Sequence, residues 1–280
     1  MRGVRKAFAS KGDDVTLSRF VKIRPEEMTP QERKRDRKQW QLPGIRANET
    51  FDAGRSLFHR KGVVEPFEKK ALVSGHCNVK IGRDVRKGKL FRGYWIYTLT
   101  LEERATCPRT CQHWEDCYGN NMPWAKRLRH GPRLEQQIEL ELNGLFAVKT
   151  SGRGAHKKPL RTGVLVRLHA LGDFYSRDYV LFWGRMLRSF PKLAVYGYTA
   201  RKPGSDIGKT IAALKREFGP RFAIRWSDGG AKRDCTVSIK TEDQAPAGSF
   251  VCPEQTGKTT ACATCGLCWN TDRNVAFIAH

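Results

Sequence analysis

The stretch VLVRLHALGD, residues 164–173, decides the fold that we expect. Its aliphatic first half is typical of a buried strand, and the strand pattern ends at Gly172 and Asp173. A helical pattern follows over residues 177–189 and stops before Pro191. A strand, a short turn and a helix in this order form the repeating unit of α/β proteins.

The same alternation continues on both sides of this stretch. Because crossovers between parallel strands are right-handed, the resulting sheet either stays open or curls into a full or partial barrel. The sequence therefore predicts an α/β fold with a parallel sheet. Further strands are expected over 94–99, 193–199, 222–226 and 236–239, and further helices over 124–148 and 206–218.

Composition divides the chain into three predicted regions. Residues 1–70 form a basic N-terminal arm, residues 71–240 an α/β core, and residues 241–280 a cysteine-rich C-terminal segment. Within the arm, a plausible helix carries a basic run that either follows nucleic-acid phosphates or only faces solvent. The candidate nucleic-acid-binding residues of this run are Arg33, Lys34, Arg35, Arg37 and Lys38.

The charge balance indicates a polyanionic partner. The chain carries 52 Lys and Arg against 28 Asp and Glu, a formal net charge of +24. Such an excess attracts DNA or RNA, and less strongly an anionic membrane surface, although it is also compatible with a basic protein that binds neither. No apolar run approaches the length of about 18 residues that a spanning helix needs. The N-terminus lacks the apolar region of a secretory signal, so we expect a cytoplasmic protein.

Seven of the nine cysteines fall into two tight groups, which is typical of metal chelation in a reducing compartment. The first cysteine group is Cys107, Cys111 and Cys117, with the spacing C-x3-C-x5-C. Three thiols on one loop suit a [4Fe–4S] cluster with one iron left open. Zinc is the alternative, with His113 as a fourth ligand, and unligated thiols are a third interpretation.

The second cysteine group is Cys252, Cys262, Cys265 and Cys268. Its C-x2-C-x2-C run is similar to that of ferredoxins, and Cys252 completes a set of four thiolates. Such a set binds an iron–sulfur cluster or a zinc ion, in a structural or electron-transfer role. The sequence also allows the two groups to share a single site.

The predicted topology brings the first cysteine group near a second polar turn. The first cysteine loop follows the strand at 94–99, whereas Gly172 and Asp173 follow the strand at 164–169. The carboxyl ends of parallel strands meet at one edge of a sheet, where chemistry usually collects. We therefore expect these two turns to face one another.

Six stretches resemble the phage and plasmid family known as gene product 88. They are YTLTLEERATCPRTC, CYGNNMP, RLHALGDFYS, VYGYTAR, VCPEQTGKTTACATCGLCW and NVAFIAH. The resemblance runs from about residue 77 to the end of the chain. It implies a phage protein in the host cytoplasm and no particular activity.

The order strand, three-cysteine loop, helix and strand with a Gly-acid turn also resembles the radical S-adenosylmethionine (SAM) enzymes. That resemblance implies a partial (βα) barrel with a [4Fe–4S] cluster and SAM on its open iron. The cysteine spacing and the Leu-Gly-Asp turn depart from the usual pattern of that superfamily. It implies Asp173 and Arg201 as catalytic residues and a cofactor-binding set of Gly172, Asp173, Asn120, Thr199 and Arg201.

Other interpretations stay open for several of these residues. Asp173 also fits a helix N-cap, Arg201 a surface charge that faces phosphate, and His169 a packed strand residue. The aromatic residues that either stack on a base or belong to the core are Trp114, Tyr118, Trp124 and Trp226.

Three functions compete at this point. We expect an iron–sulfur enzyme that resembles radical SAM enzymes and modifies nucleic acid or a nucleotide, without a membrane partner. The first alternative is a non-enzymatic nucleic-acid-binding protein with structural iron–sulfur or zinc sites. The second is a redox or interaction protein that targets a host complex.

Overall fold

The computed structural model divides the chain into two compact units, Met1–Ile45 and Arg46–His280. In the first unit, β1 (Gly3–Phe8) pairs antiparallel with β2 (Leu17–Ile23). The predicted basic helix with Arg33, Lys34, Arg35, Arg37 and Lys38 lies outside the residues that the structure describes, and the region boundaries at residues 70 and 240 stay predictions. The described residues are 3–8, 17–23, 54–147, 150–151, 158–159, 162–228 and 233–279.

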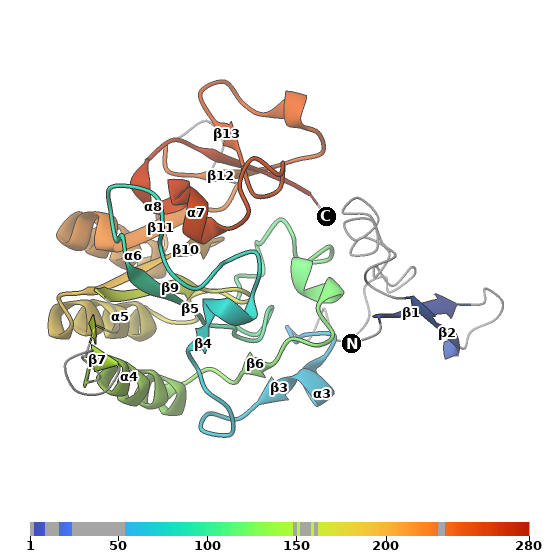
Figure 1. Cartoon of the computed structure of the whole chain (residues 1–280), viewed down its shortest axis with the longest axis horizontal. Helices are drawn as coiled ribbons and strands as arrows, with labels where there is room; N and C mark the ends of the chain where they lie inside the picture. Colours follow the sequence, from blue (N-terminus) through green and yellow to red (C-terminus); the bar gives the residue numbers. More distant parts are fainter. Residues whose placement is uncertain are drawn as a thin grey trace. The chain divides into compact units, whose positions relative to one another are not determined.

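Five strands form the central sheet of the second unit: β4 (Val73–Ser74), β5 (Tyr94–Thr98), β9 (Gly163–Leu168), β10 (Leu193–Thr199) and β11 (Phe222–Trp226). Their spatial order is β11-β10-β9-β5-β4. The strands β5, β9, β10 and β11 are parallel and follow their order in the chain, whereas β4 pairs antiparallel with β5 (Figure 1). The predicted α/β fold with a parallel sheet is confirmed, and the described strands do not close into a barrel.

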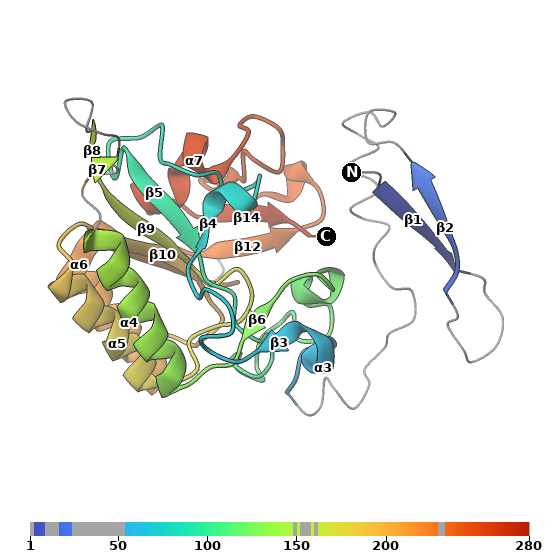
Figure 2. The ribbon, with the colours of Figure 1, turned by 60° about the horizontal axis from the view of Figure 1, so that its bottom comes forward.

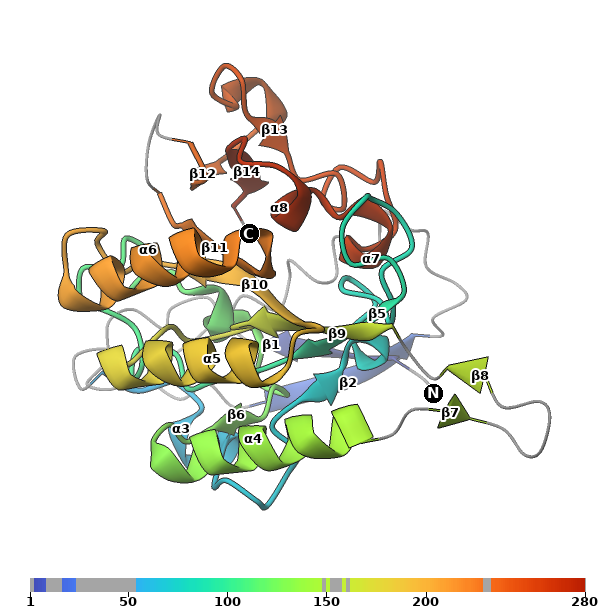
Figure 3. The same cartoon turned by 90° about the vertical axis from the view of Figure 1, so that its left-hand side faces the viewer.

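Three helices connect the parallel strands: α4 (Pro132–Ala147), α5 (Arg177–Ser189) and α6 (Asp206–Phe218). They lie side by side over one face of the sheet (Figures 2 and 3). Right-handed crossovers between successive neighbouring strands always return on the same side, which explains this one-sided arrangement. The carboxyl ends of β5, β9, β10 and β11 consequently share one edge, which we call the carboxyl edge.

Local signals set most helix boundaries. The hydroxyls of Ser176 and Ser205 accept hydrogen bonds from backbone amides at the starts of α5 and α6, so both helices begin where we predicted. The predicted helix over 124–148 is wrong in its first turns, since α4 begins only at Pro132. Residues Arg127–Leu128 instead form β6, which pairs with β3 (Val63–Val64).

The main core fills the space between the sheet and the three helices. Along β9, Val164, Val166 and Leu168 face this core, whereas Leu165 faces the opposite side of the sheet. This alternation follows from the period of two residues in a strand. The helices contribute fully buried side chains that include Leu134, Ile138, Tyr179, Trp183 and Ile211.

The C-terminal segment covers the other face of the sheet. It contains β12 (Thr236–Ile239), β13 (Phe250–Val251), β14 (Val275–Ile278), α7 (Cys262–Cys265) and α8 (Leu267–Asn270). Ala261, Ala263 and Trp269 pack there with Leu165 and Tyr196 of the sheet. The sheet therefore lies between the helical layer and the cysteine-rich segment (Figure 3).

The remaining elements of the second unit are short. No described helix combines the length and the apolar character that membrane crossing requires. The short elements are α3 (His59–Gly62), η2 (Gly75–Cys77), η3 (Tyr118–Asn121), β7 (Thr150–Ser151), β8 (Lys158–Pro159), η5 (Gly219–Arg221) and η6 (Glu242–Gln244).

Candidate functional site

The first cysteine group lies on the loop that leaves the carboxyl end of β5. Backbone hydrogen bonds from Cys111 to Pro108 and from Trp114 to Cys111 fold this loop into successive turns, and Cys117 precedes η3. The Cys107 thiol is close enough to those of Cys111 and Cys117 to interact electrostatically with both. Burial is the main cause that raises the pKa of Cys107 well above its usual value and that of Cys117 to about 11. The three thiols thus converge and stay protonated when nothing binds them.

The turn after β9 holds this cysteine loop in place. The Asp173 amide donates a hydrogen bond to the Thr106 hydroxyl at 3.1 Å, and that hydroxyl donates to the Glu102 carbonyl at 2.8 Å. Gly172 has a φ of +87°, and a Cβ there would come within 2.7 Å of the Thr106 hydroxyl oxygen. Only glycine permits this approach without strain. The two predicted turns therefore meet at the carboxyl edge.

The Asp173 carboxylate is buried and accepts three hydrogen bonds within the protein. Its Oδ1 accepts from the Phe174 amide and the Thr199 hydroxyl, both at 2.7 Å, and its Oδ2 from the Ala200 amide at 2.8 Å. Burial nevertheless raises the pKa of Asp173 to about 6. The alternative interpretation of Asp173 as a helix N-cap is wrong, because Ser176 caps α5.

Arg201 and Asn120 also bind protein groups at this edge. The Arg201 guanidinium donates to the carbonyls of Phe174 and Thr106, at 2.8 Å and 2.6 Å. The Asn120 side chain accepts from Arg104 and donates to the Glu115 carbonyl, both at 2.8 Å. The predicted cofactor-binding residues thus gather around the first cysteine group, where they already hold the loop to the sheet.

His113 connects the cysteine loop to the carboxyl end of β11. Its Nε2 lies 3.1 Å from an Asp228 carboxylate oxygen and 2.9 Å from the Ser238 hydroxyl, and its Nδ1 lies 3.4 Å from Asp116. The hydrogen bond with Asp228 is the main cause that raises the pKa of His113 to about 9. Both ring nitrogens of His113 thus face Asp228, Ser238 or Asp116, and this arrangement does not favour His113 as a zinc ligand.

Arg104 is a residue of this site that the sequence interpretation missed. Its guanidinium is within electrostatic range of Cys107, Cys111 and Cys117, and its Nε donates to the Trp114 carbonyl at 2.9 Å. Burial lowers its pKa, and the negative charges of thiolates would oppose that effect. A fixed cation therefore lies beside the first cysteine group.

The second cysteine group lies between the sheet and the C-terminal segment. Cys262 and Cys265 belong to α7, and Cys268 to α8, with Gly266 in the left-handed conformation at a φ of +72° between the two helices. The Cys252 and Cys268 thiols both interact electrostatically with those of Cys262 and Cys265. Burial is the main cause that raises the pKa values of Cys252 and Cys265 above their usual range. It also raises the pKa of Cys262, to about 12.

The two cysteine groups have different electrostatic partners among the described residues. The other thiols that interact with those of Cys107 and Cys117 belong to the first group. The other thiols that interact with those of Cys252, Cys262 and Cys265 belong to the second group. Within the described part of the chain, no three His, Cys, Asp or Glu side chains lie close enough to hold a single metal ion. A cubane cluster binds each thiolate through a different iron atom, so its ligands stand farther apart than those of one ion.

The remaining predicted residues have mixed surroundings. Tyr118 and Trp124, which follow Cys117 in the sequence, expose 44% and 62% of their surface, whereas Trp226 packs against the main core. The Trp114 ring lies 5.2 Å from the Arg109 guanidinium carbon. His169 is buried, with its Nε2 3.1 Å from the Tyr179 hydroxyl.

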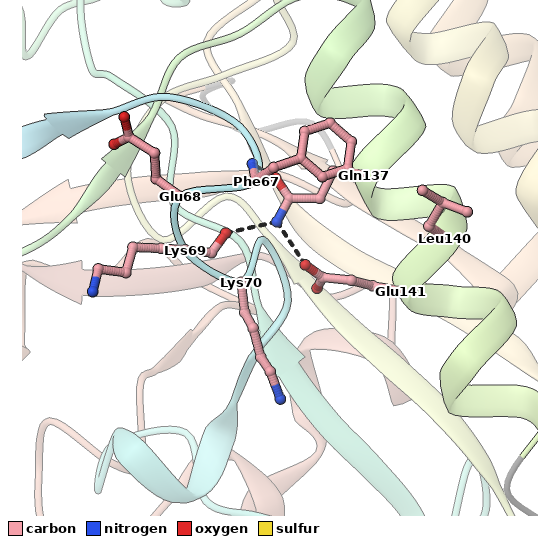
Figure 4. Close-up of a pocket in the computed structure, with 7 residues that line it drawn as sticks. All are labelled: Phe67, Glu68, Lys69, Lys70, Gln137, Leu140 and Glu141. Carbon is pink, nitrogen blue, oxygen red and sulfur yellow. Dashed lines mark hydrogen bonds between the residues drawn. The ribbon is translucent and has the colours of Figure 1, made fainter.

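A surface hollow elsewhere in the unit has a structural explanation. It lies between α4 and the loop around Lys69, and Figure 4 shows the Gln137 amide donating to the Lys69 carbonyl and to Glu141. Glu141 also accepts hydrogen bonds from the amides of Ala71 and Leu72. These polar groups hold the loop on the helix.

Comparison with known proteins finds similarity over part of the chain. Residues 78–203 match the family model described as Gene product 88. The "Gene 88 protein" of Mycobacterium phage L5 is 29% identical over 136 residues, which cover 40% of this chain and 54% of that protein. The "Gene 88 protein" of Mycobacterium phage D29 is 29% identical over 129 residues, which again cover 40% of this chain and 54% of that protein. The chain spans about half the length of these curated relatives.

The gene product 88 match contains the first cysteine group, the turn at Asp173 and Arg201, but ends before the second cysteine group. It supports the expected resemblance to that family. No solved structure matches the chain. The resemblance to radical SAM enzymes gains no support from the comparisons and stays a prediction.

Proposed function

We propose that this chain is an iron–sulfur protein whose first cysteine group holds a [4Fe–4S] cluster with one iron not bound by protein. Three converging thiols at the carboxyl edge carry this proposal. The histidine on their loop, His113, contacts Asp228 and Asp116 and is therefore not placed to serve as a fourth ligand. A site with three thiolates suits a cluster with an open position better than a structural zinc ion.

The surroundings of the thiols fit an anionic cluster. Cys107, Cys111 and Cys117 are all harder to ionise than a free thiol, so a bound cation is needed to keep them as thiolates. Arg104 supplies a fixed positive charge beside them. The carboxyl edge is also the usual place for cofactors in parallel α/β sheets.

A finer proposal is a radical SAM-like enzyme. The parallel strands β5, β9, β10 and β11 in chain order, with the three connecting helices on one face, support a relation to a partial (βα) barrel. When bound, the cluster would pass one electron from an external reductant to the sulfonium of SAM, which is the chemistry that the resemblance implies. Gly172, Asp173, Thr199 and Arg201 would position the loop against the sheet, and Asn120 would brace it from within.

The substrate that the charge favours is nucleic acid. An excess of 24 positive charges concentrates a polyanion at the protein surface, and the exposed rings of Tyr118 and Trp124, which follow Cys117 in the sequence, are suited to base stacking. For a phage protein this substrate would be DNA or RNA in the host cytoplasm. Neutralising the basic run at Arg33–Lys38 should flatten the salt dependence of DNA affinity, and an unchanged slope would remove this run from the interface.

One observation favours a second candidate, a non-enzymatic nucleic-acid-binding protein with structural metal centres. Asp173, Thr199, Arg201 and Asn120 all bond to protein groups, as they would if they served only to hold the cysteine loop. The third candidate, a redox or interaction protein that targets a host complex, would need only the metal centres.

Anaerobic purification separates these candidates. The wild-type protein should be brown, contain iron and inorganic sulfide, and cleave SAM when a reductant is added. Cys111→Ala should lose part of the iron and all SAM cleavage while keeping most of its DNA affinity. Cys77→Ala is the matched control, because Cys77 is exposed and lies outside both groups. A colourless protein that holds zinc would instead support the structural candidate.

A further inference from the structure

An arginine that has no acidic partner among the described residues lies under the second cysteine group. Arg167 projects from β9 on the face that the C-terminal segment covers, opposite Val166 and Leu168. In the register of the sheet it pairs with Tyr196 on β10. Its guanidinium carbon lies 5.5 Å from the ring centroid of Tyr196 and 4.4 Å from that of Tyr198.

The bonding of Arg167 differs from that of its neighbour Arg225. Arg225, from β11, donates to the carbonyls of Cys268, Thr271 and Arg273, and it also lies 3.5 Å from an Asp234 carboxylate oxygen. Arg225 therefore holds the backbone from Cys268 to Arg273 in place by hydrogen bonds.

Among the described residues, Arg167 has no carboxylate within ion-pair distance, and its buried Nε has no hydrogen-bond partner. A buried charge without compensation is costly, since low-dielectric surroundings penalise the ionised group. Stacking on two aromatic rings offsets only part of that cost. The position of Arg167 thus suits a negative charge nearby that the described residues do not supply.

The groups closest to this arginine are thiols of the second cysteine group. Cys262 and Cys268 are within electrostatic range of the guanidinium. The Tyr198 hydroxyl lies 3.0 Å from the Cys268 sulfur, and the buried Tyr196 hydroxyl lies close to Cys262. One cation and two hydroxyls from adjacent strands therefore face two thiols of the same group.

We propose that Arg167, Tyr196 and Tyr198 form a cationic platform that positions an anionic metal–thiolate centre on the second cysteine group. The inference rests on the proposed presence of a metal there, but not on its identity. Four thiolates around Zn²⁺ carry a net charge of about −2, and the same four around a [4Fe–4S] cluster in its 2+ state carry an equal charge. Arg167 lowers the cost of burying that charge, and Tyr198 orients Cys268 by donating a hydrogen bond to its sulfur.

The test measures metal retention by the full-length protein against a chelator. Arg167→Gln should weaken metal binding at the second group by about 10- to 100-fold, as is usual when a partner of a metal ligand is removed. Arg167→Lys should restore most of it, because the charge is kept. Tyr198→Phe should weaken retention in the same direction but less. The measurement is repeated in a Cys111→Ala background, so that metal at the first group does not contribute.

Matched controls separate the platform from general destabilisation. Arg188→Gln removes an exposed arginine that pairs with Glu217, and Tyr175→Phe removes a hydroxyl that bonds to Glu135 on the helical side. Both should retain metal as the wild type does. If iron is present, Arg167→Gln and Tyr198→Phe should also make the midpoint potential more negative, because a positive charge and a hydrogen bond to sulfur both favour the reduced cluster.

Two results would overturn the platform. The first is wild-type retention in both Arg167→Gln and Tyr198→Phe, and the second is a wild-type protein without metal at the second group. A zinc ion at the second group, with the expected losses in the variants, would support the platform while contradicting a cluster there. Failure of the inference can therefore be distinguished from failure of the proposed function. If Arg167→Gln does not fold, unchanged retention in Tyr198→Phe decides against the platform by itself.

Discussion

The Asp173 amide donates a hydrogen bond to the Thr106 hydroxyl at 3.1 Å, across 67 residues of sequence. This bond joins the turn after β9 to the residue before Cys107, so the first cysteine group is anchored to a second strand of the sheet. Arg201 strengthens the same junction, because its guanidinium binds the Thr106 carbonyl. The position of the cysteine loop therefore depends on residues that are not cysteines.

Thr106→Val tests this junction. The variant keeps the shape of the side chain but leaves the buried Asp173 amide without its acceptor, which should lower the free energy of unfolding by about 1–3 kcal/mol. Metal retention at the first cysteine group should fall, whereas retention at the second should not change. Urea unfolding and metal analysis on the same preparation provide both measurements. Equal losses at the two groups would show that Thr106 has no specific role at the first.

Gly172→Ala should destabilise the turn after β9. Its φ of +87° is unfavourable for any residue with a side chain, and the new Cβ would lie 2.7 Å from both Leu101 and Thr106. We expect the free energy of unfolding to fall by more than about 1 kcal/mol. Gly204→Ala is the control, since a Cβ there meets nothing within 4 Å. Chemical denaturation of the two variants, side by side, should show a clear difference between them.

His169 should make the protein sensitive to acid. Burial, together with the charge of Arg167, lowers its pKa to about 3. The unfolded chain has the ordinary pKa of about 6.5, so it binds more protons between these values, and stability falls as the pH drops from about 6.5.

The loss from His169 should reach about 1.4 kcal/mol for each pH unit well inside this window. His169→Gln removes it, so the free energy of unfolding of this variant should depend less on pH between about 6 and 4. Taking the difference in free energy of unfolding between the two pH values removes any pH-independent effect of the substitution. Parallel pH profiles for wild type and variant would show that folding does not lower the pKa of His169.

The buried ion pair between Glu103 and Arg127 should be essential to the cysteine loop. The two side chains are almost fully buried and lie 2.6 Å apart, and Arg127 also donates to the carbonyls of Gly119 and Met122 beside Cys117. Glu103→Gln should cost about 3–5 kcal/mol, because it leaves a buried guanidinium uncompensated. Thermal unfolding provides the measurement.

An exposed pair provides the control for Glu103. Glu65 and Arg129 form an ion pair in which both side chains are about half exposed. Glu65→Gln should therefore change the stability by less than about 1 kcal/mol. Similar effects for the two substitutions would mean that the Glu103 pair does not stabilise the cysteine loop beyond an ordinary surface interaction.

Much of the second half of the sheet could be predicted from local pattern. The strand at 193–199 and the helices at 177–189 and 206–218 have clear periodicity and serine caps, and the structure confirms their boundaries. The helix predicted over 124–148 is wrong at its start, because Arg127 enters a strand pair and a buried ion pair with residues more than 20 positions away. Periodicity carries no information about such distant partners.

The convergence of Cys107, Asp173 and Thr199 could be predicted from topology, since their strands are parallel and in chain order. The packing of the C-terminal segment on the sheet could not be predicted in this way, because it depends on contacts between short apolar stretches that lie far apart in the sequence. Arg104 and Arg167 were missed because arginine is common in a chain with 52 basic residues. For Arg167 a signal existed, since it is the one charged residue in the apolar strand at 164–168.

The central claim is that the first cysteine group holds an iron–sulfur cluster. Its most direct test compares the iron and sulfide content of anaerobically purified wild type with that of Cys111→Ala. We predict a brown wild-type protein that loses one cluster's iron and sulfide in Cys111→Ala and keeps the rest. Equal iron and sulfide in the two proteins, or zinc alone in the wild type, would contradict the account.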